Sequence, residues 1–177
     1  MKVKILKLFL KKGIIIQGSS RSEGHTSKIV SILKETTGFD SIDLNQLNIG
    51  HFDYEFKNRA DDFIALFKNI VTNYNSIIFV TPIYWYAMSG IMKVFFDRIS
   101  DFLVLEKDYG RLLRGKEMAS IRVSNDKKYY EGFEMPFKNS AAYLGMLYKG
   151  HLHTWVEREG VTEKMKNKIH EFVTNKL

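Results

Sequence analysis

Apolar positions along the chain follow two alternating patterns, short runs and stripes at helical spacing. Short apolar runs over Gly13–Gln17, 39–44, 76–81, 117–123 and 145–151 predict β-strands. GIIIQ and SIIFV are continuous apolar runs, which is typical of central strands covered on both faces. Apolar residues three and four positions apart predict helices over 26–37, 59–74, 89–103, 131–144 and 161–175, with Asn58 as the N-cap of the second.

Strands that alternate with helices of this length predict an α/β domain with a doubly wound parallel sheet. The domain is expected to span residues 1–177 as a single unit. Residues 1–12 form an N-terminal extension, for which an irregular amphipathic segment and an extra strand fit equally well. Ligands of such sheets bind beyond the carboxyl ends of the strands, so the loops that follow the strands are the places to look for a site.

The loop after the first strand, GSSRSEGHTS at 18–27, is composed like an anion-binding site. It opens a helix, whose first backbone N–H groups and partial positive charge attract a phosphate. Its hydroxyls, arginine and histidine add donors, and its glycines let the backbone approach an anion. The motifs GxxxxGK[ST] and GxGxxG are both absent, which leaves a mononucleotide as the candidate ligand. A polar surface loop with a good helix cap is the alternative.

The loop after the third strand contains three consecutive aromatic residues, Tyr84, Trp85 and Tyr86. Flat apolar rings between a strand and a helix provide walls for an aromatic ligand. Pro82 stiffens the backbone beside them. From composition alone, rings that plug the core or a dimer interface fit equally well.

Together, GSSRSEGHTS at 18–27 and PIYWYAMSGIMKVFFDR at 82–98 resemble the NADPH-dependent FMN reductase family of flavodoxin-like proteins. The resemblance extends over residues 13–175 and is sharpest in these two stretches. It implies a flavodoxin-like five-stranded parallel sheet in the order 2-1-3-4-5, with helices on both faces. It also implies FMN as cofactor, NADPH or NADH as co-substrate, and a homodimer with flavin sites near the interface. The apolar segment 90–105, which includes Phe95, Phe102 and Leu103, is the candidate dimer contact.

The resemblance also implies the residues of the flavin site. The FMN phosphate would be held by Ser19, Arg21, His25, Thr26 and Ser27. The flavin ring would lie along Pro82, Ile83, Tyr84 and Trp85, and Ser124 and Asn125 would donate hydrogen bonds to it. Relatives often carry a glycine-rich loop after the fourth strand, whereas SNDKKYY stands here at 124–130. Its lysines and tyrosines would change the shape of the pocket and therefore the substrate.

Composition excludes several other classes of site and partner. The chain has no cysteine, so disulfides, thiolate nucleophiles and iron–sulfur clusters are absent. His151 and His153 could share one face of a strand as a metal pair, but two partly exposed strand-end histidines are the preferred interpretation. The net charge of +7 comes without a nucleic-acid motif and favours a solvated basic surface. Without a long apolar stretch or a signal peptide, we expect a cytoplasmic protein and no membrane partner.

The expected function is that of an FMN-dependent NAD(P)H oxidoreductase. It would pass a hydride from nicotinamide to flavin and then electrons to a quinone, azo, nitro or flavin acceptor, a small molecule. No catalytic side chain is expected, because the cofactor carries the chemistry. One alternative is a flavodoxin-type FMN electron carrier without pyridine-nucleotide activity. Another is a scaffold or regulatory protein that kept the fold without the flavin.

Overall fold

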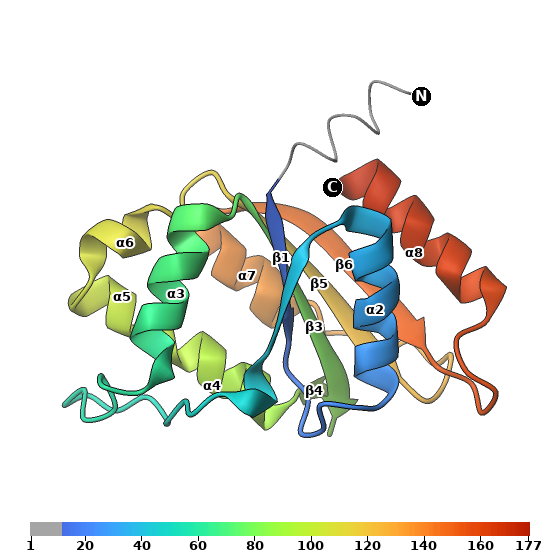
Figure 1. Ribbon diagram of the computed structural model, residues 1–177, viewed down its shortest axis with the longest axis horizontal. Helices are drawn as coiled ribbons and strands as arrows, with labels where there is room; N and C mark the ends of the chain where they lie inside the picture. Colours follow the sequence, from blue (N-terminus) through green and yellow to red (C-terminus); the bar gives the residue numbers. More distant parts are fainter. Residues whose placement is uncertain (1–11) are drawn as a thin grey trace.

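The computed structural model describes residues 12–177, and the two interpretations of the N-terminal extension lie almost wholly outside this range. A parallel sheet runs through the centre of the molecule in the order β2-β1-β3-β5-β6 (Figure 1). Its strands are β1 (Gly13–Gln17), β2 (Asp40–Asp43), β3 (Ser76–Tyr84), β5 (Glu117–Ser124) and β6 (Leu147–Trp155). A short strand, β4 (Ala87–Met88), pairs antiparallel with the end of β3. If β4 is left out and the five parallel strands are numbered in chain order, this is the expected order 2-1-3-4-5. The flavodoxin-like fold is therefore confirmed.

Helices cover both faces of the sheet (Figure 1). One face carries α3 (Asp62–Asn73), α4 (Gly90–Arg98) and α7 (Met135–Tyr143), and the other carries α2 (His25–Thr37) and α8 (Glu163–Lys176). Burying apolar surface on both faces accounts for the continuous apolar runs of the central strands, because alternate residues of β1 enter different cores. Ile14 and Ile16 belong to the core under α3 and α4, whereas Ile15 packs under α2 and α8.

Phenylalanines make up much of the core under α3 and α4. The rings of Phe63 and Phe67 stack with centroids 5.4 Å apart, and Phe95 and Phe102 meet them edge-on or tilted. Such offset and edge contacts are the favoured geometries of aromatic pairs. Phe95 and Phe102 are fully buried within the single chain, so these two residues cannot form the dimer contact that the sequence suggested.

Several helix boundaries differ from the prediction, and two of these differences have a clear local cause. The N-cap of α3 is Asp61 and not Asn58, because the Asp61 carboxylate accepts the Phe63 N–H at 3.0 Å. The predicted helix over 89–103 is divided into α4 and α5 (Asp101–Val104), followed by α6 (Lys107–Arg111). Between α4 and α5 the N–H groups of Ile99 and Ser100 bond to carbonyls three residues back, which tightens the helix and turns the chain.

The last strand also differs from the prediction, since it begins later and runs further than 145–151. Gly145 adopts a left-handed conformation with φ of 70° and ends α7, while the Met146 N–H bonds back to the Ala141 carbonyl. The strand β6 then continues to Trp155. Similarly, β3 extends beyond residue 81 to Tyr84, because its last residues pair with β4 as a hairpin.

Arg98 ties the long loop between β2 and α3 to the core. Its side chain is 1 % exposed and donates to both Asp61 and Asp101, at 2.5 and 2.8 Å. It also donates to the backbone carbonyls of Gly50 and Asn58. Burial opposes the ionisation of Asp61, but hydrogen bonds from Arg98, Phe63 and Gly50 hold the pKa of that carboxyl below its ordinary value. This cation is therefore fully paired.

Candidate functional site

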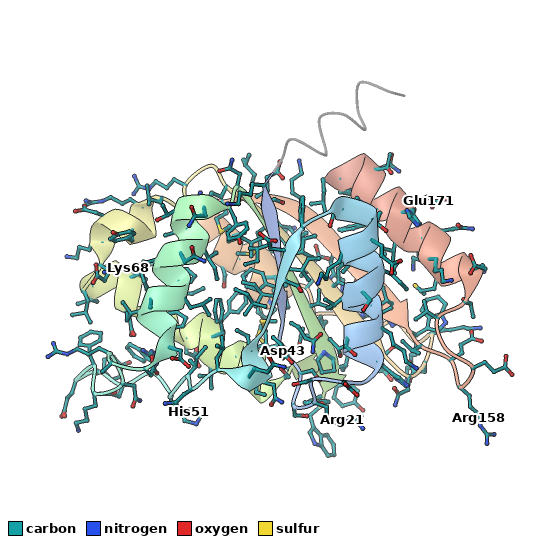
Figure 2. All side chains as sticks on the ribbon, in the orientation of Figure 1. Arg21, Asp43, His51, Lys68, Arg158 and Glu171 are labelled. Atoms are coloured by element: carbon teal, nitrogen blue, oxygen red, sulfur yellow. The ribbon has the colours of Figure 1, made fainter. Side chains whose placement is uncertain are left out.

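The loops after β1, β3 and β5 surround a cavity of about 440 Å³ at the carboxyl end of the sheet. Figure 2 shows Arg21 and Asp43 at this end, opposite the C-terminus of α8. Such a volume lies in the usual range for small-molecule and cofactor sites. The cavity is lined by Ser19, Arg21, Gly24, His25, Thr26, Pro82, Ile83, Tyr84, Trp85, Tyr86, Val123, Ser124, Asn125, Asp126 and Tyr130. The structure thus brings together all the predicted site residues except Ser27.

Ser27 caps the helix and does not line the cavity. Its Oγ accepts the Gly24 N–H at 2.9 Å and donates to the Gly24 carbonyl at 3.0 Å, which fixes the first turn of α2. The backbone N–H groups of residues 25–27 have no hydrogen-bond partner in the described part of the chain. The start of α2 therefore presents free donors and the positive end of the helix dipole.

The loop after β1 is held close to the start of α4. The Gly18 carbonyl accepts the Ser89 hydroxyl at 2.7 Å, and the Gly18 N–H donates to the Val80 carbonyl at 2.9 Å. A Cβ at residue 18 would lie 2.7 and 2.8 Å from side-chain atoms of Met92, so a larger residue would push the loop away. Gly18 is needed here for close approach between two backbone segments.

Contacts between residues far apart in the sequence join the three loops around the cavity. The hydroxyls of Ser20 and Tyr84 are 2.8 Å apart. His25 Nδ1 and Asn125 Oδ1 are 2.9 Å apart. Because an amide oxygen only accepts, His25 Nδ1 carries the hydrogen in this pair, and His25 Nε2 has no hydrogen-bond partner among the residues that the structure describes. The rings of Tyr86 and Tyr130 meet edge-on with centroids 5.3 Å apart, which joins the β3–β4 hairpin to the third loop.

The aromatic residues after β3 stand at the tip of this hairpin. Tyr84 is 40 %, Trp85 93 % and Tyr86 65 % exposed, so these rings do not fill the core of the chain. Tyr84 pairs with Ala87, which leaves Trp85 and Tyr86 as a two-residue turn with φ of 49° and 67°. Positive φ at both central residues defines a type I′ turn, which usually takes Asn-Gly. Two large aromatic residues in this conformation cost backbone strain, a feature common at ligand sites.

The third loop contributes Val123 and Asp126, which the sequence interpretation missed, and Tyr130, one of the tyrosines that it expected to shape the pocket. They lie in or next to the segment 124–130, whose departure from a glycine-rich loop was the available signal. Ser124 is less free than expected, because its hydroxyl lies 2.8 Å from Nε2 of His153 and 2.6 Å from the Asp126 carbonyl. Asn125 keeps its side-chain N–H groups free for a ligand, because within residues 12–177 its side chain is bonded through Oδ1 alone.

His151 and His153 point to the same face of β6 but contact serines. His151 Nδ1 lies 2.8 Å from Ser120 Oγ, and His153 Nε2 lies 2.8 Å from Ser124 Oγ. Burial, with nearby Arg122, lowers the pKa of His151 to about 3 and that of His153 to about 4. Within residues 12–177, no three His, Cys, Asp or Glu side chains gather as metal ligands, and no helix is long and apolar enough to cross a membrane.

Fold and site together define a flavodoxin-like protein with a mononucleotide-sized cavity at the carboxyl edge of its sheet. The family model of NADPH-dependent FMN reductases matches residues 12–159. The chain belongs to this family of NAD(P)H-dependent FMN oxidoreductases, whose cofactor is FMN.

One sequence relative agrees with the family assignment, and solved structures share the fold. The chain is 29 % identical over 150 residues to a putative NAD(P)H-dependent FMN-containing oxidoreductase of Bacillus subtilis, covering 78 % of this chain and 81 % of the relative. The fold of this chain is similar to that of the Trp repressor binding protein of B. subtilis, with a TM-score of 0.69 and 22 % identity. The match covers 91 % of this chain and 97 % of that protein. The fold is also similar to that of the NAD(P)H:(acceptor) oxidoreductase FerB of Paracoccus denitrificans, with a TM-score of 0.67, 16 % identity and coverage of 93 % and 96 %.

Proposed function

We propose that this protein oxidises NADH or NADPH and passes the electrons through FMN to a small quinone, azo, nitro or flavin acceptor in the cytoplasm. The observation that supports this proposal is the cavity at the carboxyl edge of the sheet, which is formed by three loops joined to one another by side-chain hydrogen bonds. One end of it offers anion donors, and another offers aromatic rings. A ligand with a phosphate at one end and a flat ring at the other matches both.

The donors on the α2 side fit the FMN phosphate. The free N–H groups of residues 25–27 would donate to the phosphate, and Arg21 would add a full positive charge. Ser19 and Thr26 are nearly buried beside them and add hydroxyls. Ser27 would contribute its backbone N–H, because its hydroxyl already caps the helix.

The hairpin side fits the flavin ring. Pro82, Ile83, Tyr84 and Trp85 would form its wall, and Asn125 would donate to its polar edge. Bound FMN supplies hydride and electron transfer, for which the protein needs no general base. The side chains orient the ring, exclude water from one face and hold the phosphate.

The absorption spectrum of the purified protein tests the proposal. We expect a flavin spectrum, or one restored by adding FMN, that bleaches under anaerobic addition of NADH or NADPH and returns when a quinone is added. FMN that binds without bleaching would identify an electron carrier. A colourless protein that FMN does not restore would identify a scaffold and contradict the proposal.

Arg21→Ala should weaken FMN about 10- to 100-fold, because a charge-assisted hydrogen bond contributes about 1.5–3 kcal/mol. Riboflavin lacks the phosphate, so its affinity should change little. Titration calorimetry with both flavins measures this difference. Arg158→Ala, which removes an exposed arginine that does not line the cavity, is the charge-matched control. Equal losses for both flavins would contradict a phosphate contact by Arg21.

Trp85→Ala should weaken FMN by about 1–3 kcal/mol through lost stacking and burial, whereas Trp85→Phe should bind almost normally. Tryptophan fluorescence of the flavin-free protein should fall as FMN is added, and Trp85→Phe should remove most of this quenching. Trp155→Phe is the control, because Trp155 is partly buried between Lys127 and Lys168. Normal FMN affinity in Trp85→Ala would rule out this ring as the flavin wall.

We also propose a homodimer. Exposed apolar residues gather over α5, α6 and α7, where Leu103 and Tyr143 line the same two surface hollows. The exposed members are Leu103, Val104, Leu105, Tyr109, Leu112 and Tyr143. Large exposed apolar patches of this kind mark interfaces.

Light scattering should therefore give about twice the chain mass of 20.7 kDa. Val104→Glu places a charge in the patch and should shift the protein to the monomer. Leu147→Glu is the matched control, because Leu147 is equally exposed but lies at the start of β6. A concentration-independent monomer in the parent protein would refute the dimer.

A further inference from the structure

Arg122, in the middle of β5, is a buried cation with almost no partners. Its side chain is 0 % exposed, and Nη1 donates to the Tyr130 carbonyl at 2.8 Å. Nε and Nη2 have no hydrogen-bond partner among the described residues, and no carboxylate there forms an ion pair with this guanidinium. A buried charge left in this state is costly, so it needs a reason.

Arg98 shows how the same protein treats a buried arginine that supports the fold. It is equally buried, yet all three of its nitrogens are bonded, and two carboxylates neutralise it. Arg122, by contrast, donates one hydrogen bond to a backbone carbonyl. Its guanidinium carbon lies over the rings of Tyr129 and Phe133, at 4.5 and 5.6 Å from their centroids. Aromatic faces compensate only part of a desolvated charge.

The two unpartnered nitrogens are neighbours on one edge of the guanidinium. The N–H groups of Nε and Nη2 point the same way and form the fork that binds a carboxylate or phosphate through two parallel hydrogen bonds. The nitrogen that is bonded, Nη1, lies outside this edge. The structure therefore leaves open the edge that recognises an oxyanion.

A second unpartnered group packs against the same aromatic ring as Arg122. The Nε2 atom of His151 is buried and has no hydrogen-bond partner among the described residues, while its Nδ1 contacts Ser120. When Ser120 donates to Nδ1, Nε2 carries the hydrogen and becomes another donor. His151 and Arg122 contact the same ring, that of Phe133, at 5.5 and 5.6 Å.

The segment that covers Arg122, residues 125–131, also lines the proposed flavin cavity. Asp126 and Tyr130 line that cavity, and the Tyr130 carbonyl is the partner of Arg122. Residues 125–129 are exposed, and residues 125–131 make no backbone-to-backbone hydrogen bond with the described chain. A ligand in the cavity is thus separated from Arg122 by one loosely bonded segment.

We propose that Arg122 and His151 form a second anion site, which binds a carboxylate or phosphate group of a small ligand when residues 125–131 move off the guanidinium. This site is distinct from the phosphate donors at the start of α2. The identity of the ligand rests on the proposed function. In an NAD(P)H oxidoreductase the oxyanion would be the 2′-phosphate of NADPH or a carboxylate of an acidic acceptor.

The stability of the unliganded protein is the first test. Arg122→Met should leave the melting temperature unchanged or raise it, because it removes an unpaired buried charge. Arg98→Met should lower the melting temperature by about 5 °C or more. A fall of that size in both Arg122→Met and Arg122→Gln would identify a structural cation and overturn the proposal.

Anion binding is the second test and needs no flavin. In an Arg21→Met background, which removes the charged donor of the other anion site, phosphate or acetate at constant ionic strength should raise the melting temperature saturably. Adding Arg122→Met should strongly reduce this rise, and adding Arg158→Met should not. No rise, or the same rise with and without Arg122, would mean that only water occupies the site and would overturn the proposal.

Steady-state kinetics then separate the two sources of the oxyanion. An increase in KM for NADPH but not for NADH in Arg122→Met assigns the site to the cofactor phosphate. An increase in KM only for a carboxylate-bearing quinone, against its uncharged analogue, assigns it to an acidic acceptor. Unchanged values for all four would exclude a role in turnover and contradict the proposal for the active enzyme.

Discussion

Replacing Arg98 with methionine should lower the free energy of unfolding by about 3–5 kcal/mol. The substitution leaves the carboxylates of Asp61 and Asp101 without the cation that both contact, and both side chains are almost fully buried. It also removes the donors to the Gly50 and Asn58 carbonyls, which hold the loop between β2 and α3. The loss of stability would come from the broken buried ion pair and not from lost packing, because methionine has a similar length.

Urea unfolding followed by circular dichroism measures this change. Arg111→Met is the control, because Arg111 pairs with Asp108 on the surface, where both side chains are largely exposed. Exposed pairs contribute about 0–1 kcal/mol, so the control should unfold almost like the parent. Similar losses in the two variants would show that the buried network adds nothing beyond a surface pair.

Acidification from about pH 6.5 to about pH 4 should destabilise the protein steeply. The pKa of His151 is lowered to about 3 and that of His153 to about 4, by burial first and then by the charge of Arg122. In the unfolded chain both return towards the ordinary value of 6.5. Between these values the unfolded state binds more protons, so stability rises with pH in this window and is lost as pH falls through it.

The slope should reach about 1.4 kcal/mol per pH unit for each histidine. Denaturant unfolding at half-unit pH intervals measures it. His151→Gln and His153→Gln each remove one titrating group while keeping a side chain that can bond the neighbouring serine, so each should reduce the slope. A parent slope that neither variant changes would show that other groups, and not these histidines, control acid stability.

The local pattern of the sequence determined the class of fold and two of the three loops of the site. The runs GIIIQ and SIIFV are apolar throughout because both faces of β1 and β3 are covered, and this feature is visible in the residues themselves. The polar loop at 18–27 and the aromatic loop at 84–86 follow these strands directly. Since parallel strands end at one edge, their order along the chain was enough to place both loops at one site.

Tertiary structure alone decided which side chains are free to act. Ser27 resembles a phosphate ligand in the sequence, but the first turn of α2 uses its hydroxyl as a cap. Asp126 and Tyr130 reach the cavity through a loop with no glycine-rich pattern. The bonds Ser20–Tyr84 and His25–Asn125 join residues 64 and 100 positions apart, which no local periodicity encodes.

The two buried arginines show the same division most clearly. In the sequence, Arg98 and Arg122 each end or interrupt an apolar stretch and look alike. Packing surrounds Arg98 with carboxylates from α5 and the start of α3, and places Arg122 under tyrosine and phenylalanine rings with one edge open. Whether a buried charge is paired depends on which distant groups the fold brings to it, because the energy of a charge is set by its surroundings and not by its neighbours in the chain.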